Sequence, residues 1–406
     1  MIFFTKTYII LLVLNIKVGG FFLSTKRAKQ NQQYDEYWKL TVEYTDIFGA
    51  PFNNTLKVIV KFIDDNIEKI NNIDIEKYKN KNKEEKSKFQ DLYGDLQSII
   101  FTIYHKEDFG SIRKSINQFV KLGFISPYLK GYHKLTKKFL NISSNDKEMK
   151  KSVFSEIFYD NASFNSSITN NNTNKKEINF LLKTLMYHPD KVLSKQDIIA
   201  LMVTDLSSFS KGYLTVDELK EQYNYSKAID FEENKYNQIA YMFTFLNLMP
   251  DLTAHKDKGV AFAEDGLVLS DIDTTRDPYM HALYRNNLKL ESKRVYNDIV
   301  CYVEKIPYKG LVASHIKPCH VCLEELNTTE AYDYNNGLLI QQNIDAYFDK
   351  FDLSFNDDGT MLIASNVDKN IAEKYCKYTL DKEILTPERL KYLSYHRNRF
   401  FEKHAS

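Results

Sequence analysis

The sequence predicts an α+β fold in which a mainly helical N-terminal part precedes a smaller C-terminal domain of strands and helices. Apolar residues recur at three- and four-residue spacing over much of the first 250 positions, as expected of amphipathic helices. Within residues 311–355, two short apolar runs flank a loop and a helical segment follows them. With 406 residues, the chain is long enough for two or three domains with cores of their own.

Charge and cysteine content narrow the class of protein. A formal net charge of +1 excludes an overall basic protein, so any nucleic-acid-binding charge must be concentrated in patches. Four cysteines in so long a chain do not make a disulfide framework, which predicts a reduced, cytoplasmic protein. The apolar run at residues 7–22 is too short and interrupted for a membrane span. We expect it to be a buried N-terminal element or an over-extension of the reading frame, although a secretory signal is an alternative.

The first predicted region covers residues 1–160. Helical periodicity is clear at residues 34–48 and 52–70, whereas the mixed-charge run at 77–88 predicts a solvated helix face. Residues 109–145 contain no acid, and aromatic residues lie among their basic side chains. The basic residues of this stretch are Arg113, Lys114, Lys121, Lys130, Lys134, Lys137 and Lys138.

This acid-free stretch predicts a DNA-binding surface. Its helix, exit and turn are also typical of a winged helix-turn-helix, and the alternative is a basic surface helix packed by its apolar face. Phosphate contacts are expected from Lys114, Lys134, Lys137 and Lys138. Base contacts are expected from Arg113, Ser115 and Asn117, because arginine pairs with guanine and asparagine with adenine.

A polar, low-complexity segment at residues 161–176 predicts a linker or flexible loop. Beyond it, several helical runs precede a hairpin pattern at residues 259–271. Helices followed by a hairpin predict a second winged-helix-like module at residues 177–272. The third region, residues 276–406, contains the C-terminal motifs.

One histidine, one amide and one carboxylate occupy matching places in these C-terminal motifs. His315 ends the first apolar run, Asn336 opens the second, and Asp345 lies nine positions later in the helical segment. In this order the histidine can take a proton from water, and an oxygen ligand on the helix can hold a divalent ion against a phosphate. The asparagine can fix the loop that carries the histidine.

These blocks resemble the HNH nucleases, which have a ββα-metal fold, and in particular their restriction endonuclease branch. The matching pieces are SHIKP at 314–318, DxxNGLL at 333–339, FDK at 348–350 and the LSFNDDG segment at 353–359. Weaker similarity extends upstream to residues 284–301 and downstream to 390–400, so that about the last third of the chain is covered.

The resemblance implies that His315 is the general base, that Asn336 is structural, and that Asp345 occupies the position where many members carry the final histidine. Carboxylate at that position suits Mg²⁺ or Mn²⁺. The residue before the base is often aspartate and a second metal ligand, but here it is Ser314, a poor ligand for a hard cation. Asn343 is a weaker alternative ligand.

Two further groups of residues carry expectations. Cys319 and Cys322 form a CxxC pair, but the second pair of a zinc site is missing, so ordinary thiols are expected, with a site that adds Cys301 and His320 as the alternative. The last helix offers phosphate contacts from Lys391, Arg397, Arg399 and Lys403.

Together these observations predict a site-specific, metal-dependent double-stranded DNA endonuclease of the type II restriction kind. The products would be 5′-phosphate and 3′-hydroxyl ends. A homodimer is compatible with this function, and the resemblance implies a companion DNA methyltransferase; no membrane association is expected. The alternatives are a structure-specific or toxin-type HNH nuclease without sequence specificity, and a non-catalytic DNA-binding protein.

Overall fold

The computed structural model describes residues 37–104, 109–263 and 276–405. The described chain divides into two compact units. The first contains residues 37–144 and 157–262, and the second contains residues 145–156 and 263–405. The apolar run at residues 7–22 lies outside the described residues. None of the described helices is both long and apolar enough to span a membrane.

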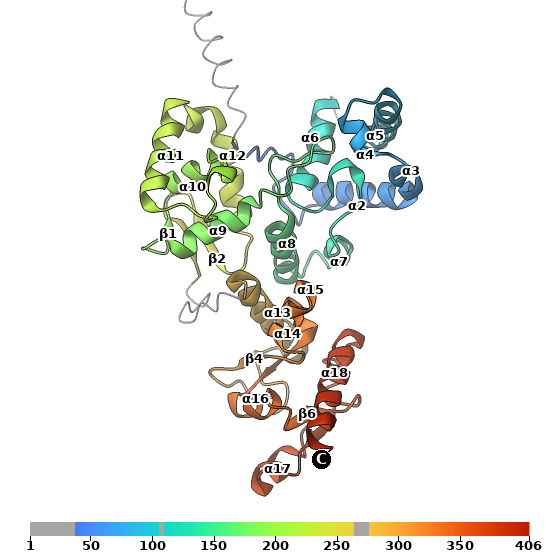
Figure 1. Ribbon diagram of the computed structural model, residues 1–406, viewed down its shortest axis with the longest axis vertical. Helices are drawn as coiled ribbons and strands as arrows, with labels where there is room; N and C mark the ends of the chain where they lie inside the picture. The colour runs from blue at the N-terminus through green and yellow to red at the C-terminus, as the bar shows by residue number, and fades with distance from the viewer. Residues whose placement is uncertain (1–36, 105–108, 264–275, 406) are drawn as a thin grey trace, which may run out of the picture. The chain divides into compact units, whose positions relative to one another are not determined.

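Helices form the N-terminal part of the first unit, and the helical periodicity at residues 52–70 is confirmed (Figure 1). The helix expected at residues 34–48 is not formed, because residues 37–49 contain no helix. Pro51 opens α2, and the apolar residues of this helix at three- and four-residue spacing are buried. Phe52 contacts Phe119 at a ring distance of 4.9 Å, and Phe124 contacts Phe139 at the same distance. The helices are α2 (Ala50–Asp65), α3 (Ile67–Asn71), α4 (Ile75–Lys79), α5 (Lys83–Tyr104), α6 (Phe109–Lys121), η1 (Pro127–Leu129) and α7 (Thr136–Asn141). The next helix, α8 (Lys147–Asn161), is divided between the two units, with its residues up to Glu156 in the second.

The wing expected after α6 is not formed among these residues. Within 37–104 and 109–161 the structure describes no strand, and the chain after α6 makes a single antiparallel bridge between Ile125 and Tyr132. The expected helix is therefore present as α6, but the described residues after it do not confirm a winged helix-turn-helix.

The segment at residues 161–176 is packed, whereas a linker was expected. Ser163 and Ser166 are fully buried, and the Asn117 side chain accepts a hydrogen bond from the backbone N–H of Ile168 at 2.9 Å. The backbone N–H of Trp38 also donates to the carbonyl of Met202 at 2.8 Å. The first two predicted regions therefore share one unit, because side chains and backbone join them on both sides of this segment.

The rest of the first unit combines helices with a three-stranded antiparallel sheet of order β1-β3-β2. Ser194 and Thr215 begin α10 and α11 with capping boxes. The hairpin of this module joins β2 to β3, and the second half of the expected hairpin, residues 264–271, lies outside the described residues. The elements are α9 (Glu177–Tyr187), β1 (Val192–Leu193), α10 (Lys195–Met202), η2 (Leu206–Ser208), α11 (Val216–Ala228), α12 (Phe231–Leu246), β2 (Leu252–His255) and β3 (Gly259–Phe262).

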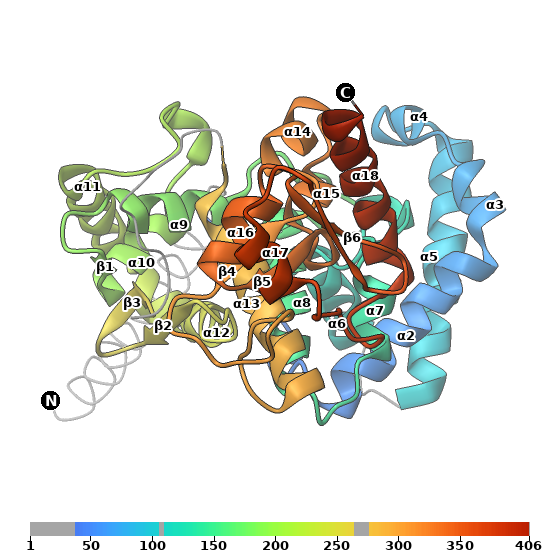
Figure 2. The same ribbon diagram turned by 90° about the horizontal axis from the view of Figure 1, so that it is seen from below.

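The second unit has the strand, loop, strand and helix order that the sequence predicted. Strand β4 pairs antiparallel with β5, with His315 opposite Gly337, and α16 follows β5 directly. A second hairpin pairs β6 with β7, and α18 lies along β6 (Figure 2). The elements are α13 (Pro278–Tyr296), β4 (Val312–His315), α14 (Cys319–Glu324), α15 (Thr328–Tyr332), η3 (Tyr334–Asn336), β5 (Gly337–Ile340), α16 (Gln342–Phe348), β6 (Leu353–Phe355), β7 (Met361–Ile363), α17 (Lys369–Tyr375) and α18 (Pro387–His404).

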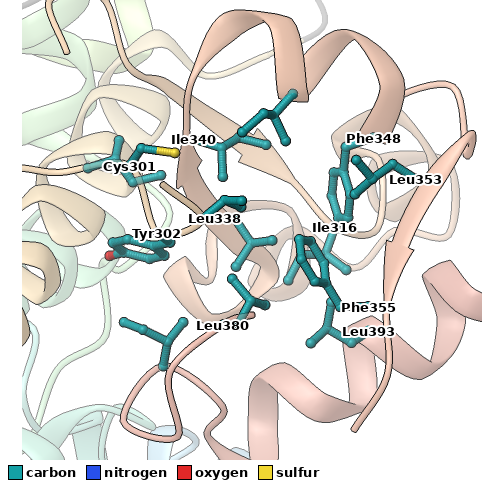
Figure 3. Packing of buried hydrophobic residues seen from close by; sticks show 14 of the residues in the cluster. Cys301, Tyr302, Ile316, Leu338, Ile340, Phe348, Leu353, Phe355, Leu380 and Leu393 are labelled. Carbon is teal, nitrogen blue, oxygen red and sulfur yellow. The ribbon is translucent and has the colours of Figure 1, made fainter. Parts of the chain in front are cut away.

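An apolar core joins these elements behind the first hairpin (Figure 3). Leu338 and Ile340 of β5 are fully buried against side chains from α16, β6 and α18, among them Phe348, Phe355 and Leu393. This packing fixes the positions of β4 and α16, which carry the polar residues described next.

Candidate active site

Polar side chains of the second unit line a cavity of about 350 Å³ beside the first hairpin. They come from the start of α13 and the residues just before it, from β4, from the turn into α14, from α16 and its C-terminal end, and from α18. Its polar and ionisable lining residues are Arg276, His281, Ser314, His315, Cys319, His320, Asp345, Asp349 and His396.

His315 lies at the end of β4 in a defined orientation. Its Nε2 atom is 3.0 Å from the carbonyl oxygen of Ala331, and a carbonyl can only accept, so Nε2 carries the proton and Nδ1 keeps a lone pair. The ring stacks on Tyr284 with centroids 4.3 Å apart and on His281 at 5.9 Å. Burial lowers the pKa of His315 to about 4, so the imidazole is neutral at pH 7.

Tyr284 packs against the ring of this histidine and also contacts the backbone of both strands. Its hydroxyl lies 3.1 Å from the carbonyl oxygen of Ser314 and 3.3 Å from that of Asn336. A Cβ atom at Gly337 would lie only 2.1 Å from the same hydroxyl, so the close approach of the tyrosine requires glycine there. This contact explains in physical terms why a glycine opens β5.

Asn336 is fully buried and joins the loop after β4 to the start of β5. Its Nδ2 atom donates to the carbonyl oxygens of Lys317 and Glu330, both at 2.9 Å. Its Oδ1 atom accepts from the backbone N–H of Lys317 at 2.7 Å. The amide therefore holds the loop that carries the Ala331 carbonyl, the hydrogen-bond partner of His315.

Two carboxylates of α16 face the same cavity as Ser314. The Oδ1 atom of Asp345 and the Oγ atom of Ser314 are buried, and neither makes a hydrogen bond of ordinary geometry with the described residues. Asp349 caps α16 in helical conformation, and its backbone N–H donates to the Asp345 carbonyl at 2.8 Å. Asn343, the weaker ligand expected from the sequence, is exposed and lies outside this cavity.

The electrostatics of Asp349 reflect this neighbourhood. Its surface is exposed, but that surface opens onto the cavity, where the walls reduce the hydration of the carboxylate. This partial burial, together with the negative charge of Asp345, raises the pKa of Asp349 to about 6. The positive charge of Arg276 and the nearby Ser314 hydroxyl act in the opposite direction.

Four polar residues of the cavity were not predicted from the sequence, namely Arg276, His281, Asp349 and His396. Burial, with the charges of Arg285 and Arg276, lowers the pKa of His281 to about 4. Helical spacing could have found Asp349, since it lies four residues after Asp345 in the segment predicted as helix. No comparable local signal points to Arg276 or His281.

Two of the cysteines belong to this region: Cys319 lines the cavity, and Cys322 lies beside Asn336. Cys301, Cys319 and Cys322 are buried thiols, and the sulfur of Cys322 is 3.8 Å from Nδ2 of Asn336. Among the described residues, no three His, Cys, Asp or Glu side chains are grouped so that they could hold a metal ion by themselves.

The residues expected to bind DNA from α6 divide into two groups. Arg113 and Lys114 are exposed, and Lys114 is 3.4 Å from the carboxylate of Glu43. Ser115 is fully buried and donates to the Ile112 carbonyl at 2.8 Å, while Asn117 bonds to the backbone of the packed segment at 161–176. In this structure Ser115 and Asn117 serve the fold, which disfavours their contact with bases.

Several of the other basic residues expected to contact phosphates already form ion pairs within the protein. Lys134, Lys137 and Lys138 are exposed, but Nζ of Lys137 lies 2.8 Å from the Asp64 carboxylate. In the second unit, Arg397 is 2.6 Å from Asp357 and Arg399 is 2.8 Å from Glu402. Each of these pairs lowers the net positive charge at its part of the surface.

Comparison with protein-family models connects this geometry to a known class. Residues 300–356 match the HNH_2 model, described as HNH endonuclease. The second unit therefore contains an HNH-type nuclease domain. The matched residues include both strands of the first hairpin, α16, and the side chains of His315, Asn336, Asp345 and Asp349. A search of curated proteins finds no match to the chain. A nuclease domain implies that the protein is a hydrolase and that DNA is its substrate.

Proposed function

We propose that this protein is a metal-dependent, site-specific double-stranded DNA endonuclease of the type II restriction kind. The observation that carries the proposal is the orientation of His315 beside the acidic cavity, inside a region that matches an HNH endonuclease model. The lone pair on Nδ1 is available because the carbonyl of Ala331 occupies the protonated Nε2.

In this mechanism His315 acts as the general base. A water oxygen bonds to phosphorus as the bond from phosphorus to the 3′ oxygen breaks, and the water gives its proton to Nδ1 of His315. The departing 3′ oxygen takes a proton from solvent, which leaves 5′-phosphate and 3′-hydroxyl ends. Asn336 acts as a positioning residue, because it fixes the loop whose carbonyl orients the imidazole.

The cavity suits a hard divalent cation such as Mg²⁺ or Mn²⁺. The buried Oδ1 atom of Asp345 lacks a hydrogen-bond partner among the described residues, and so does the Ser314 hydroxyl beside it. Buried polar atoms are ordinarily paired, so two unpaired oxygens facing one cavity indicate that a cation or ordered water satisfies them. Such an ion supplies positive charge that stabilises the phosphate in the transition state.

The first unit would select the DNA sequence. Within residues 177–262 the order is helix, strand, further helices and a hairpin, and the three strands form a sheet of order β1-β3-β2. This arrangement supports a winged-helix-like module in these residues. The proposal includes double-stranded DNA as partner, a homodimer that cuts both strands, a cytoplasmic location and a companion methyltransferase that protects host DNA. Exposed Arg113, Lys114, Lys134 and Lys138 remain proposed phosphate contacts of the first unit, and Arg399 of the second.

Cleavage of one DNA of known sequence tests this function. The wild-type protein should cut it into discrete fragments with Mg²⁺ and leave it intact in EDTA. His315→Ala should cleave DNA about 10²–10⁴-fold more slowly than the wild type, while its DNA affinity changes only a few-fold. The control variant is Glu383→Ala, which removes an exposed side chain of the second unit that does not line the cavity.

Other outcomes would favour the alternatives. Random fragments from unrelated DNAs would indicate a structure-specific or toxin-type nuclease. Binding without cleavage in any divalent metal would indicate a non-catalytic DNA-binding protein. Cleavage by His315→Ala at the wild-type rate would remove this histidine from the mechanism.

A further inference from the structure

A second cavity lies in the first unit, far along the chain from the nuclease domain. Its volume is about 670 Å³, and ligand pockets in proteins commonly measure about 300–1,000 Å³. The lining residues come from α4, from the end of α6 and the loop after it, from the last residue of α8, and from residues 171–176. All of them belong to the first unit, so this cavity is formed within one compact body.

The lining of this cavity carries positive charge, and no acid among the described residues lines it. Its cationic side chains are Lys79, Lys130 and Lys176. Nζ of Lys79 lies 2.8 Å from the carboxylate of Glu76, but the Glu76 side chain is 77% exposed, so water screens this pair. Lys176 donates a hydrogen bond to the backbone carbonyl of Asp160, which is neutral and leaves the lysine charge in place.

Lys130 also keeps its charge. Its Nζ atom donates to the carbonyls of residues 70 and 73, the latter at 3.1 Å. Burial lowers the pKa of Lys130, and the negative charges of Asp74 and Glu85 partly oppose this effect. These two acids already have cationic partners, since Asp74 lies 3.6 Å from Lys77 and Glu85 lies 3.0 Å from Lys88. An anion in the cavity would therefore meet a partly buried ammonium group that holds no carboxylate of its own within the described chain.

The rest of the lining combines apolar and neutral polar side chains. Ile75, Ile125 and Pro127 contribute apolar surface, against which a flat aromatic ligand can pack. Amide side chains offer both hydrogen-bond donors and acceptors, and these groups suit the edge of a nucleic-acid base. The neutral polar residues of the lining are Ser126, Asn161, Asn171, Thr173 and Asn174.

Tyr128 forms a fixed part of this wall. Its backbone has φ 60° and ψ 20°, which is uncommon for a residue other than glycine. The surrounding structure holds it there, because its ring packs on Tyr78 at 5.7 Å and on Phe89 at 6.2 Å. Its backbone N–H also donates to the carbonyl of Ile168 at 2.9 Å. A wall that is fixed in advance lowers the ordering cost of binding.

We propose that this cavity binds one nucleotide, with its phosphate beside Lys79, Lys130 and Lys176 and its base against the apolar wall. In a paired duplex the bases are stacked, so the ligand is either a free nucleotide or a nucleotide of DNA that has left the stack. The inference goes beyond the proposed nuclease function, because it assigns a ligand to a region outside the match at residues 300–356.

The first test uses free nucleotides and the full-length protein in EDTA. Titration calorimetry measures the affinity for the deoxynucleoside 5′-monophosphates of adenine, guanine, cytosine and thymine. The double variant Lys79→Gln with Lys176→Gln removes two charges from exposed side chains, so the fold should be retained and binding should weaken at least about tenfold. Lys69→Gln with Lys83→Gln, which removes two exposed lysines outside the cavity, should bind like the wild type.

The second test uses DNA, again in EDTA so that metal-dependent cleavage does not interfere. Fluorescence anisotropy compares a fully paired duplex with the same duplex carrying one unpaired nucleotide. An unpaired nucleotide leaves the stack at lower cost, so the wild type should prefer the second duplex by about threefold or more. The variant Lys79→Gln with Lys176→Gln should lose this preference. Asn174→Asp, which places a negative charge in the cavity without changing the side-chain size, should lose it as well.

The two tests separate the two sources of the nucleotide. Weaker binding of monophosphates in the double variant identifies a free nucleotide as ligand, and loss of the preference for the unpaired duplex identifies a nucleotide of DNA. If Lys79→Gln with Lys176→Gln behaves like its control toward both ligands, the inference is overturned. Neither result depends on cleavage, so the nuclease function stands or fails separately.

Discussion

Arg389 and Glu291 form a doubly hydrogen-bonded ion pair in which both side chains are fully buried. Nη1 and Nη2 of the arginine lie 3.1 and 2.7 Å from the two carboxylate oxygens. The same guanidinium donates to the carbonyls of Gly337 at 3.0 Å and Tyr334 at 3.1 Å. The pair thus joins α13 and α18 to the turn that contains Asn336, and so stabilises the β4–β5 hairpin.

Removing the arginine should destabilise the second unit strongly. Arg389→Met leaves the Glu291 carboxylate buried without its partner, which costs about 3–5 kcal/mol. Urea unfolding, monitored by far-UV circular dichroism, measures the free energy of unfolding. Arg399→Met, which removes an exposed pair with Glu402, should change it by less than about 1 kcal/mol. An equal effect of the two substitutions would contradict the structural role of Arg389.

Acid should destabilise the second unit through its buried histidines. His396 is the clearest case, because it stacks on Phe348 at 3.9 Å and burial lowers its pKa to about 3. A histidine in the unfolded chain has a pKa near 6.5. As the pH falls below that value, the unfolded state binds a proton at this position and the folded state does not. The stability is present above about pH 6.5 and is lost progressively as pH falls toward 3.

The measurement is the free energy of unfolding at several pH values between 7 and 4. Each such histidine contributes a slope of up to about 1.4 kcal/mol per pH unit. His396→Phe, which keeps a ring of similar shape, should reduce the slope by up to that amount even if it lowers stability at pH 7. The same slope in both proteins would show that His396 does not titrate in this way.

Removing the ion-pair partner of Lys137 should strengthen DNA binding by the first unit. Hydrogen bonding to Asp64 raises the pKa of Lys137 and holds its charge 2.8 Å from a carboxylate. Asp64→Asn removes the competing charge, so affinity for double-stranded DNA should rise and the slope of log affinity against log salt should steepen by up to about 0.9. Asp65→Asn, the neighbouring acid paired with Lys61 at 2.6 Å, is the matched control. If neither slope nor affinity changes in Asp64→Asn, Lys137 does not contact DNA.

Much of the second unit could be predicted because its signals are local. The apolar runs of β4 and β5 and the helical pattern of α16 predicted strand, loop, strand and helix in the order observed. Antiparallel pairing then placed His315 opposite Gly337, next to Asn336. The sequence also indicated Asp345 as a helix residue near them. These relations depend on short stretches of chain, where the period of the side chains determines which face they occupy.

The tertiary structure decided which other residues share the site. His281 reaches the cavity because α13 packs against the first hairpin, and Asp349 joins it because α16 turns its acidic face toward Ser314. The residue types at these positions are ordinary for helices. Their role follows from packing between elements that lie more than 30 positions apart.

Tertiary structure also reduced the number of free positive charges on the acid-free stretch at residues 109–145. In the sequence it carries seven positive charges, but Lys121 is buried and burial lowers its pKa to about 8. Lys130 donates to the carbonyl of Ile73 at 3.1 Å, and Asp64 and Glu43 come from other segments to neutralise Lys137 and Lys114. The sequence by itself indicated the order of the elements around the β4–β5 hairpin and His315 as the proposed base, because both depend on local periodicity and motif. Only the folded chain determined which charges remain exposed and which carboxylates meet, because electrostatic energy depends on distance in space and on burial.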